Sequence, residues 1–250
     1  NAYMEVWSDN IATYDEALES GAILELSTNF DDNFQGLYVP TYIIEGDPAR
    51  GIEPLAPDLK HVKDLPKYKD VFTDPEDPSK GIIYGSISGW AADEFLYKKY
   101  LAYELDKTYS YMRPGSEAAL GASITSAYEK GLPWVGYYWE PTWIMGKYDM
   151  TLLQDEPYTD EGWEKGTCEF PSVDVTVCVN KALVESAPDV VEFLSHYKTS
   201  SAITSEALAY MMDNEADHDA TAQWFLKEYK DLWTVWVTAD AAEKVNAALD

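Results

Sequence analysis

The sequence predicts an α/β protein, because short apolar strands alternate with amphipathic helices along its 250 residues. An apolar strand at 81–85 precedes a helical pattern over 91–105, in which aromatic and aliphatic residues form one stripe. A second helical pattern over 117–130 stops at a Gly and a Pro and leads into a strand at 134–139. Strands separated by helices usually pair in parallel, so we expect largely parallel sheets.

Further elements are predicted on either side of this central region. Residues 2–7 alternate like a strand, and 10–20 favour a short helix. A second extended run covers 37–44, where Pro40 suits an edge or a crossover better than a central strand. The Pro-, Asp- and Gly-rich stretch over 46–80 indicates a long surface connection.

The last third of the chain begins with a strand and then becomes helical. Residues 172–179 alternate strictly, with valines on one face, and the pattern from 184 to the end is helical with polar faces. The chain shows no internal repeat, heptad array or low-complexity tract.

The charge balance excludes one class of partner. The chain carries 45 acidic and 18 basic side chains, a formal net charge of −27, so the Lys and Arg clusters that bind phosphates are missing and nucleic acid is not expected as a partner. The acidic residues are spread along the chain, which indicates solubility or adaptation to salt more than steering of a cationic ligand. No stretch is apolar for the roughly 18 residues of a membrane span, and no leader peptide opens the chain. If the protein is exported, its targeting segment is expected to have been removed or left out.

Motifs for catalysis and metal binding are absent from the sequence. It contains no dinucleotide-binding glycine motif, phosphate-binding loop, zinc-protease motif or nucleophile elbow. Asp213, Asp217 and Asp219 lack the Gly and the terminal Glu of a calcium loop and are interpreted as a solvated helix–helix connection. We therefore expect no enzyme activity, no cofactor and no metal site.

Cysteine and histidine also favour structural roles. Cys168 and Cys178 are too few for a disulfide framework; they can bridge neighbouring strands or stay buried as inert thiols, and burial is favoured. The histidines are scattered among charged residues, which favours surface positions over ligand positions: His61, His196 and His218.

Three of the nine tryptophans stand at turns, where they are poorly placed for a core. Trp7 ends a strand, Trp90 follows a Ser-Gly turn and opens a helix, and Trp139 ends another strand. Strand ends at one edge of an α/β sheet are where such folds bind ligands. Indole faces attract a cation that lacks hydrogen-bond donors, and free amides at the helix start near Trp90 can hold a carboxylate. Together these features predict a site for a zwitterion.

The same segments resemble a known family, the glycine betaine/proline betaine-binding proteins of ABC transporters. Residues 133–143, PWVGYYWEPTW, look like the family's W-x-P-x-W segment, and Ser88-Gly89-Trp90 looks like its carboxylate-binding turn. Residues 4–7 resemble the strand that delivers another cage tryptophan, and 170–181 resemble a crossover strand. The similarity covers nearly the whole chain.

The resemblance implies a two-lobed periplasmic-binding-protein type II fold. The first lobe would comprise 1–38 and 181–250 and the second lobe 39–180, with hinge strands near 37–44 and 172–181. Family members place a strand, a helix and another strand ahead of the position that matches Trp7, so the first lobe is expected to be incomplete at its N-terminus.

The resemblance also implies a function, namely an extracytoplasmic solute-binding protein that captures a quaternary-ammonium solute for uptake by an ABC transporter permease. Association with a membrane would then occur only through the permease or an unseen anchor. The sequence does not choose among glycine betaine, proline betaine, choline, carnitine and trimethylamine N-oxide. The tryptophan cage and the turn that receives the carboxylate would comprise Trp7, Trp90, Trp139, Gly89, Ala91 and Ala92.

One alternative from another class is a carbohydrate-active hydrolase with an aromatic cleft, because glycosidases also stack sugars on tryptophan. Its carboxylate pair would be Glu140 with either Asp9 or Glu94. No motif fixes such an acid/base pair, so this alternative is less favoured. A transporter-linked sensor or an isolated lobe without a transport role is a further alternative.

Overall fold

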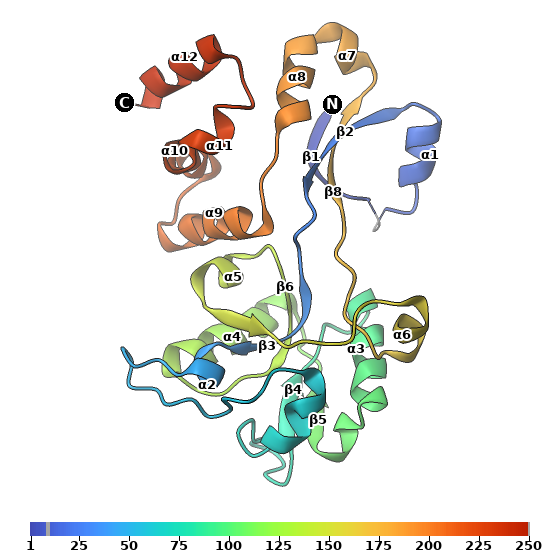
Figure 1. Ribbon diagram of the computed structural model, residues 1–250, viewed down its shortest axis with the longest axis vertical. Helices are drawn as coiled ribbons and strands as arrows, with labels where there is room; N and C mark the ends of the chain where they lie inside the picture. The colour runs from blue at the N-terminus through green and yellow to red at the C-terminus, as the bar shows by residue number, and fades with distance from the viewer. Residues whose placement is uncertain (9–10, 250) are drawn as a thin grey trace. The chain divides into compact units, whose positions relative to one another are not determined.

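The chain forms two compact units, as seen in a computed structural model that describes residues 1–8 and 11–249 (Figure 1). Unit 1 comprises 1–33, 141–146 and 172–250, and unit 2 comprises 34–140 and 147–171. Each unit contains its own β-sheet, with helices from the same unit packed against it.

The sheet of unit 2 has five strands in the order β5-β4-β6-β3-β7. Strand β4 (Gly81–Tyr84) pairs in parallel with β5 (Tyr109–Met112) and with β6 (Gly136–Trp139). Strand β3 (Gln35–Pro40) runs antiparallel to β6 and to β7 (Met150–Leu152). The carboxyl ends of β4, β5 and β6 therefore lie at one edge of this sheet.

The helices of unit 2 start and end where local chemistry requires it. Ser116 begins α4 (Glu117–Lys130) by accepting a hydrogen bond from the Ala119 N–H at 3.1 Å, and Gly131 ends it in the left-handed conformation at φ 66°. The other helices are α2 (Tyr42–Glu45), α3 (Ala91–Ala102), α6 (Asp160–Lys165) and the 3₁₀ helices η2 (Val62–Tyr68) and η3 (Leu105–Lys107). Their apolar faces bury a core that includes Ile83, Phe95, Leu96, Tyr109, Leu120, Ile124 and Val135.

The sheet of unit 1 has three antiparallel strands in the order β1-β8-β2. Strand β8 (Val175–Asn180) lies between β1 (Ala2–Trp7) and β2 (Ile23–Phe30), and α1 (Tyr14–Glu19) precedes β2. The alternating valines of β8 are fully buried, and Val177 and Val179 form a core with Leu194. The central strand is thus buried on both faces from Val175 to Val179, and only Asn180 at its end is exposed.

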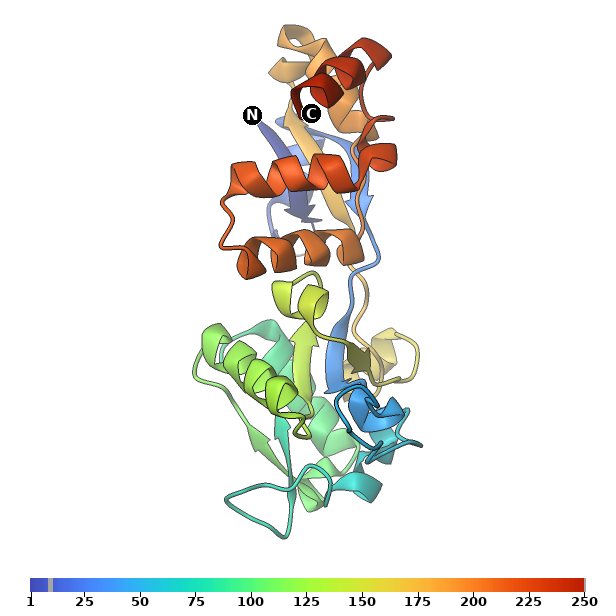
Figure 2. The same ribbon diagram turned by 90° about the vertical axis from the view of Figure 1, so that its left-hand side faces the viewer.

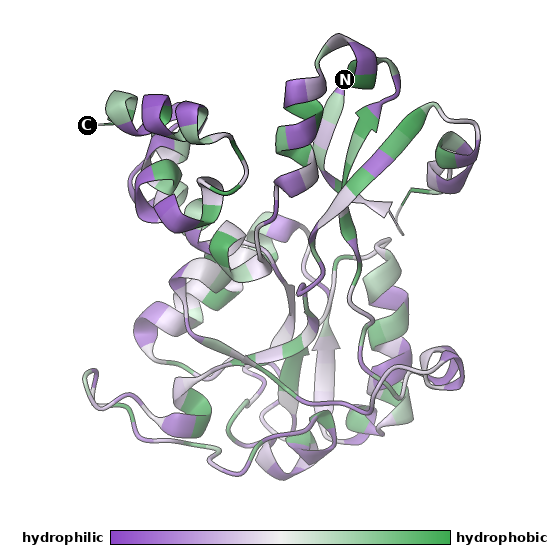
Figure 3. Cartoon of the chain, turned by 45° about the horizontal axis from the view of Figure 1, so that its top comes forward, coloured by the Kyte–Doolittle hydropathy of each residue, from purple (hydrophilic) through white to green (hydrophobic). Residues whose placement is uncertain are grey.

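Helices make up the rest of unit 1. In Figure 2, α9 and α10, coloured orange to red-orange, lie side by side, and Figure 3 shows hydrophobic and hydrophilic residues interspersed along these helices, as expected for amphipathic elements. The helices are α5 (Trp143–Lys147), α7 (Ala182–Ser186), α8 (Pro188–His196), α9 (Ser201–Asp213), α10 (His218–Glu228), α11 (Lys230–Trp233) and α12 (Ala239–Leu249). None of the helices in the described residues is long and apolar enough to cross a membrane.

Several sequence-based expectations need correction. The sheets are not largely parallel, because the sheet of unit 1 is antiparallel and two strands of unit 2 run against their neighbours. The predicted extended run over 37–44 ends at Pro40, after which α2 begins, and β3 is an internal strand with Pro40 at its end. The helix predicted for 10–20 covers only Tyr14–Glu19, and Asn10 lies outside the described residues. The helix over 117–130 is confirmed.

Candidate functional site

Two of the three singled-out tryptophans meet at the carboxyl edge of the unit 2 sheet. Trp139 is the last residue of β6, and Trp90 is the N-cap residue of α3, in the connection that follows β4. Their ring centroids lie 5.3 Å apart at an interplanar angle of 67°. Trp90 keeps 37% of its surface exposed, which is unusual for an indole and leaves a ring face available to a ligand.

Neighbouring aromatic rings hold Trp139 in place. Its ring lies 4.6 Å from that of Tyr138 and 5.8 Å from that of Tyr137, which in turn lies 6.0 Å from Phe170. The Tyr137 hydroxyl donates to Oε1 of Gln35 at 2.8 Å, and burial raises the pKa of Tyr137, so this phenol stays a neutral donor. The indole of Trp139 therefore has a fixed orientation before any ligand arrives.

The start of α3 adds an anion-binding feature beside the indoles. Trp90 adopts an extended conformation (φ −79°, ψ 146°), and no side chain of the described residues caps the helix. The first amides of a helix lack intrahelical acceptors, so those of Ala91 and Ala92 can receive a carboxylate. Gly89 has φ 93°, a conformation that favours glycine, and thereby allows the turn into this helix start.

A charged cluster beside this helix start was missed by the sequence analysis. Asp93, buried in the first turn of α3, accepts two hydrogen bonds from Nε of Arg113, each at 2.9 Å, and one from the Tyr111 hydroxyl at 3.2 Å. The Arg113 guanidinium also lies over the rings of Tyr97 and Tyr111, at 4.6 and 4.9 Å. Hydrogen bonding to Asp93 raises the pKa of Arg113. The only sequence signal for this cluster was the position of Arg113 directly after β5, and the hydrophobic periodicity did not reveal that strand.

The third tryptophan, Trp7, lies in unit 1. It is the last residue of β1; its ring packs edge-on against Phe30 at 6.0 Å, and its Nε1 donates to Oε1 of Glu5 at 3.0 Å. Its contribution to a cage with Trp90 and Trp139 stays a prediction.

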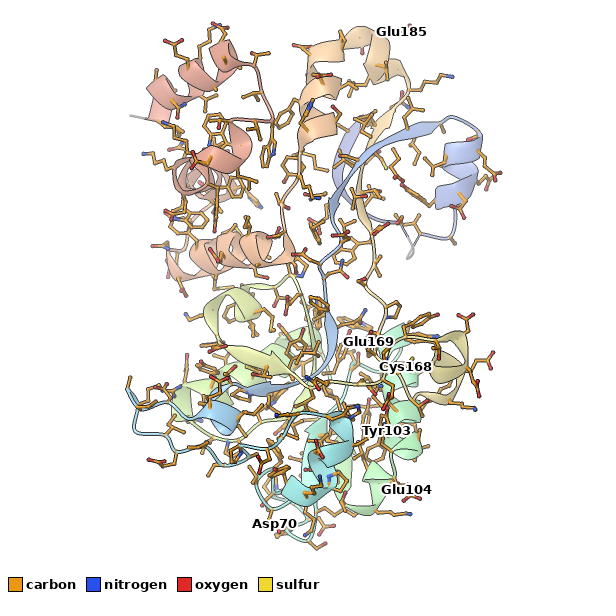
Figure 4. The ribbon with its side chains drawn as sticks, in the orientation of Figure 1. Asp70, Tyr103, Glu104, Cys168, Glu169 and Glu185 are labelled. Carbon is orange, nitrogen blue, oxygen red and sulfur yellow. The ribbon has the colours of Figure 1, made fainter. Side chains whose placement is uncertain are left out.

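A buried ion pair lies in unit 2 on the side of α3 that faces α6. Lys99 and Asp155 are paired, with side chains only 3% and 5% exposed. Nζ of Lys99 also donates to the carbonyl of Cys168, and the Tyr103 hydroxyl donates to Asp155. Tyr103 and Cys168 are labelled in Figure 4. Burial lowers the pKa of Lys99. The pair borders a cavity of about 260 Å³ that is otherwise lined mainly by apolar groups such as Leu37. Because the charges of Lys99 and Asp155 compensate each other, the role of the pair is to attach the segment after β7 to α3.

The described carboxylates of the hydrolase alternative have other partners. Glu140 accepts a hydrogen bond from the Tyr38 hydroxyl at 3.1 Å, whereas Glu94 pairs with Lys98 on the surface at 3.2 Å. Asp9 lies outside the described residues. The structure thus gives the hydrolase alternative no support.

The histidine, cysteine and acidic side chains of the described residues do not form a metal site, and several of them cap helices or are buried. Within residues 1–8 and 11–249 no group of three or more His, Cys, Asp or Glu side chains is arranged to hold a metal ion. Both cysteines are buried free thiols, as expected. His61 caps η2 by accepting from the Lys63 N–H at 3.0 Å, and Asp217 caps α10, so the connection around Asp217 is a helix–helix turn.

Comparison with known proteins gives a family match over most of the chain. Residues 1–228 match the model of the family described as the substrate-binding domain of ABC-type glycine betaine transport systems. Among curated proteins, a glycine betaine/proline betaine-binding periplasmic protein of Salmonella typhimurium is 25% identical over 205 residues, which cover 74% of this chain and 60% of that protein. A glycine betaine/carnitine transport binding protein of Listeria monocytogenes is 25% identical over 144 residues, 58% of this chain and 44% of that protein. The aligned part is thus less than two thirds of either curated relative.

Solved structures show the same fold. A glycine betaine/L-proline-binding protein of Borrelia burgdorferi superimposes with a TM-score of 0.58 at 19% identity, covering 100% of this chain and 81% of that one. A lactococcal protein in its closed form complexed with glycine betaine superimposes with a TM-score of 0.57 at 17% identity. The match covers 94% of this chain and 78% of that one. A choline-binding protein in complex with choline superimposes with a TM-score of 0.55 at 19% identity. The match covers 96% of this chain and 77% of that one. The predicted periplasmic-binding-protein type II fold is therefore confirmed.

Proposed function

Because the chain belongs to the family of substrate-binding domains of ABC-type glycine betaine transport systems, we propose that it captures a quaternary-ammonium solute such as glycine betaine outside the cytoplasm and delivers it to a transporter permease. The observation that carries this proposal is the Trp90–Trp139 pair beside the uncapped start of α3. These features offer a ligand one site for a cation and one for an anion.

The indole pair provides the cation half of the proposed site. A trimethylammonium group has no hydrogen-bond donor, so it cannot hydrogen-bond to carboxylates or carbonyls, whereas π-faces attract it directly. Contacts of this kind contribute about 0.5–2 kcal/mol each, depending on how well the site excludes water. Because Trp139 is already held by Tyr137 and Tyr138, little conformational entropy is lost when the cation binds.

The start of α3 provides the anion half. The amides of Ala91 and Ala92 and the positive end of the helix dipole lie next to Trp90, so a carboxylate can be held close to the methylated nitrogen. This arrangement favours glycine betaine, proline betaine or carnitine over a ligand that carries only a cation. We include Trp7 of unit 1 as a third member of the cage, on the basis of the resemblance of residues 4–7 to the family's strand.

Calorimetric titration tests this function directly. Glycine betaine is expected to bind, whereas 3,3-dimethylbutanoate, which has the same shape but a carbon in place of the charged nitrogen, is expected to bind at least tenfold more weakly because it lacks the cation–π term. Proline betaine, choline, carnitine and trimethylamine N-oxide complete the panel. Equal affinity for glycine betaine and its carbon isostere would contradict a cation site.

A matched variant separates ligand contact from stability. Trp90→Ala should weaken glycine betaine binding, whereas Trp163→Ala should weaken it far less, because Trp163 stacks on Phe95 at 3.8 Å and reaches Trp139 only through Phe170 and Tyr137. Loss of binding in both variants together would indicate damage to unit 2 rather than a cage role for Trp90.

A further inference from the structure

We propose that Arg113, acting with Asp93, makes this site prefer ligands that carry a carboxylate over choline-like cations. The inference deepens the proposed function and rests on it. It concerns the residues around the start of α3, whose charges decide what kind of group can lie beside the methylated nitrogen.

Arg113 is held rigidly, yet part of its guanidinium has no partner. One edge donates to Asp93, and one face lies over the rings of Tyr97 and Tyr111. The terminal NH groups have no acceptor among residues 1–8 and 11–249, and the side chain is 38% exposed. An arginine that is fixed in this way presents donors in a planar fork, a geometry that matches a carboxylate.

The strand topology places Arg113 at the ligand edge. It follows β5 directly, and the carboxyl end of β5 lies beside those of β4 and β6, from which Trp90 and Trp139 come. Asp93 stands three residues after Trp90, within the first turn of α3. One helical turn spans about 5.4 Å, and the Arg113 guanidinium lies over Tyr97 in the second turn of α3, so the Asp93–Arg113 pair lies about one to two turns from the amides of Ala91 and Ala92.

A second polar group at this edge lacks a partner. Ser86, in the connection between β4 and Trp90, is fully buried, and its hydroxyl has no hydrogen-bond partner among the described residues. Its backbone is hydrogen-bonded to the Tyr111 side chain, which in turn donates to Asp93. Buried hydroxyls are rarely left unsatisfied, so the Ser86 hydroxyl adds a spare polar group close to the Tyr111–Asp93 hydrogen bond.

Removing the arginine reverses the local charge. With Arg113 present, the Asp93 carboxylate is neutralised and the spare guanidinium donors make the helix start more positive. Without it, Asp93 would place an uncompensated negative charge beside the amides that receive the ligand, repelling a carboxylate and attracting a bare cation. The indoles alone make no such distinction, because both ligand classes present the same methylated head.

Titration of Arg113→Gln with glycine betaine and with choline tests the proposal. At a separation of about one to two helical turns, an effective dielectric constant of 20 or more predicts that glycine betaine affinity falls about five- to tenfold, while choline affinity is unchanged or rises. The ratio of the two affinities should therefore fall at least about fivefold. Arg113→Lys keeps the charge and should hold this ratio within about threefold of the parent.

The double variant Asp93→Asn/Arg113→Gln provides a readout that a packing role would not produce. It removes the repelling carboxylate as well and should recover part of the glycine betaine affinity lost in Arg113→Gln. If Arg113→Gln does not fold, Asp93→Asn alone decides the matter, because it leaves Arg113 unopposed and should raise the preference for glycine betaine. An unchanged preference in that variant overturns the proposal.

The remaining outcomes separate this inference from the proposed function. Equal losses for both ligands in Arg113→Gln, or the same change in Arg113→Lys, overturn the charge-selection role and leave the solute-binding function intact. An unsubstituted protein that binds choline but not glycine betaine overturns the inference and the anion half of the proposed site, and leaves capture of a quaternary-ammonium solute intact. Failure to bind any methylated ammonium compound overturns the proposed function itself.

Discussion

The two units bring side chains together in different ways. In unit 2 three neighbouring strands run in parallel, so residues that end these strands or follow them lie at one edge: Trp90 after β4, Arg113 after β5 and Trp139 at the end of β6. In unit 1 the strands alternate in direction, so only β1 and β2 end at the same edge, where Trp7 meets Phe30. The parallel arrangement therefore concentrates binding groups from distant parts of the chain, whereas the antiparallel one presents a single tryptophan.

The units also differ in how they bury charge. Unit 2 encloses Lys99 and Asp155 next to α3, whereas the central core of unit 1 is formed by Val177, Val179 and Leu194. A buried ion pair adds little net stability, but removing one partner leaves an uncompensated charge. The α3 region of unit 2 is thus the part of the molecule most sensitive to a single substitution.

The largest expected effect follows from that ion pair. Lys99→Met should lower the free energy of unfolding of unit 2 by about 3–5 kcal/mol, because it leaves the Asp155 carboxylate buried without a cation. Lys165→Met removes the partner of Glu161 on the surface, where a pair contributes less than about 1 kcal/mol. Denaturant unfolding measures the loss of unfolding free energy in each variant, and hydrogen exchange in peptides from α3 shows whether the loss occurs in unit 2.

Similar destabilisation by Lys99→Met and Lys165→Met would show that burial of the pair is not what matters. Faster exchange confined to unit 1 peptides would contradict the assignment of this pair to the stability of unit 2.

The next effect concerns ligand affinity in unit 2. Trp139→Ala should weaken glycine betaine binding by about 1–2 kcal/mol, roughly 5- to 30-fold, because it removes one cation–π face and its packing. His196→Ala, at an exposed end of α8 in unit 1, should leave affinity unchanged. Calorimetric titration measures the glycine betaine affinity of both variants. Equal losses of affinity would mean that Trp139 acts through the stability of the protein and not through contact with the ligand.

Trp7 tests whether unit 1 contributes to the same ligand. Trp7→Ala should weaken binding by about 1 kcal/mol, at the lower end for a cation–π contact, because part of the indole is already engaged by Phe30 and Glu5. Tyr3→Ala, an exposed aromatic on the same strand, is the matched control and should have no effect. If the two variants bind glycine betaine equally well, the cage belongs to unit 2 alone.

The same contrast explains how much the sequence revealed. Trp90 and Trp139 were predictable as a pair because each follows an apolar strand, and strands of this kind align their ends. The start of α3 was clear from the Ser-Gly turn before Trp90, and the whole of α4 was clear from its apolar periodicity and the Gly and Pro that follow it. Local signals therefore predicted the aromatic and amide parts of the candidate site.

Arg113 was not predictable in the same way. Strand β5, Tyr-Ser-Tyr-Met, is too short and too polar to show a strand period, so nothing placed the following arginine at the ligand edge. Strand β2 was missed because Glu25 and Asn29 interrupt its apolar residues, and only pairing with β8 makes it a strand. The Lys99–Asp155 pair joins residues that are far apart in the sequence, and charge alone does not indicate burial.

The smallest expected effect is a change in the stability of unit 2 as the pH is lowered. Asp64 accepts hydrogen bonds from Nζ of Lys67 at 2.6 Å and from the His61 N–H at 3.2 Å, and the bond to Lys67 lowers the pKa of its carboxyl first of all. It is one of five carboxyl groups in unit 2 whose pKa is lowered, the others being Asp74, Asp77, Glu156 and Glu161.

A carboxyl with a lower pKa in the folded state stabilises the fold above its unfolded pKa of about 3.9, and this contribution disappears as pH falls through the lowered folded value. Asp64→Asn should therefore cost about 0.5 kcal/mol at pH 7, the scale of a partly exposed pair, and progressively less as pH falls through the lowered folded pKa and the carboxyl becomes protonated. Glu185→Gln makes the same chemical change at an exposed position of unit 1 and should cost less than Asp64→Asn at pH 7. Urea unfolding of the three proteins at pH 7, 4 and 2 measures these differences, and a cost of Asp64→Asn that stays constant down to pH 2 would show that the amide disturbs η2 rather than removing a charge.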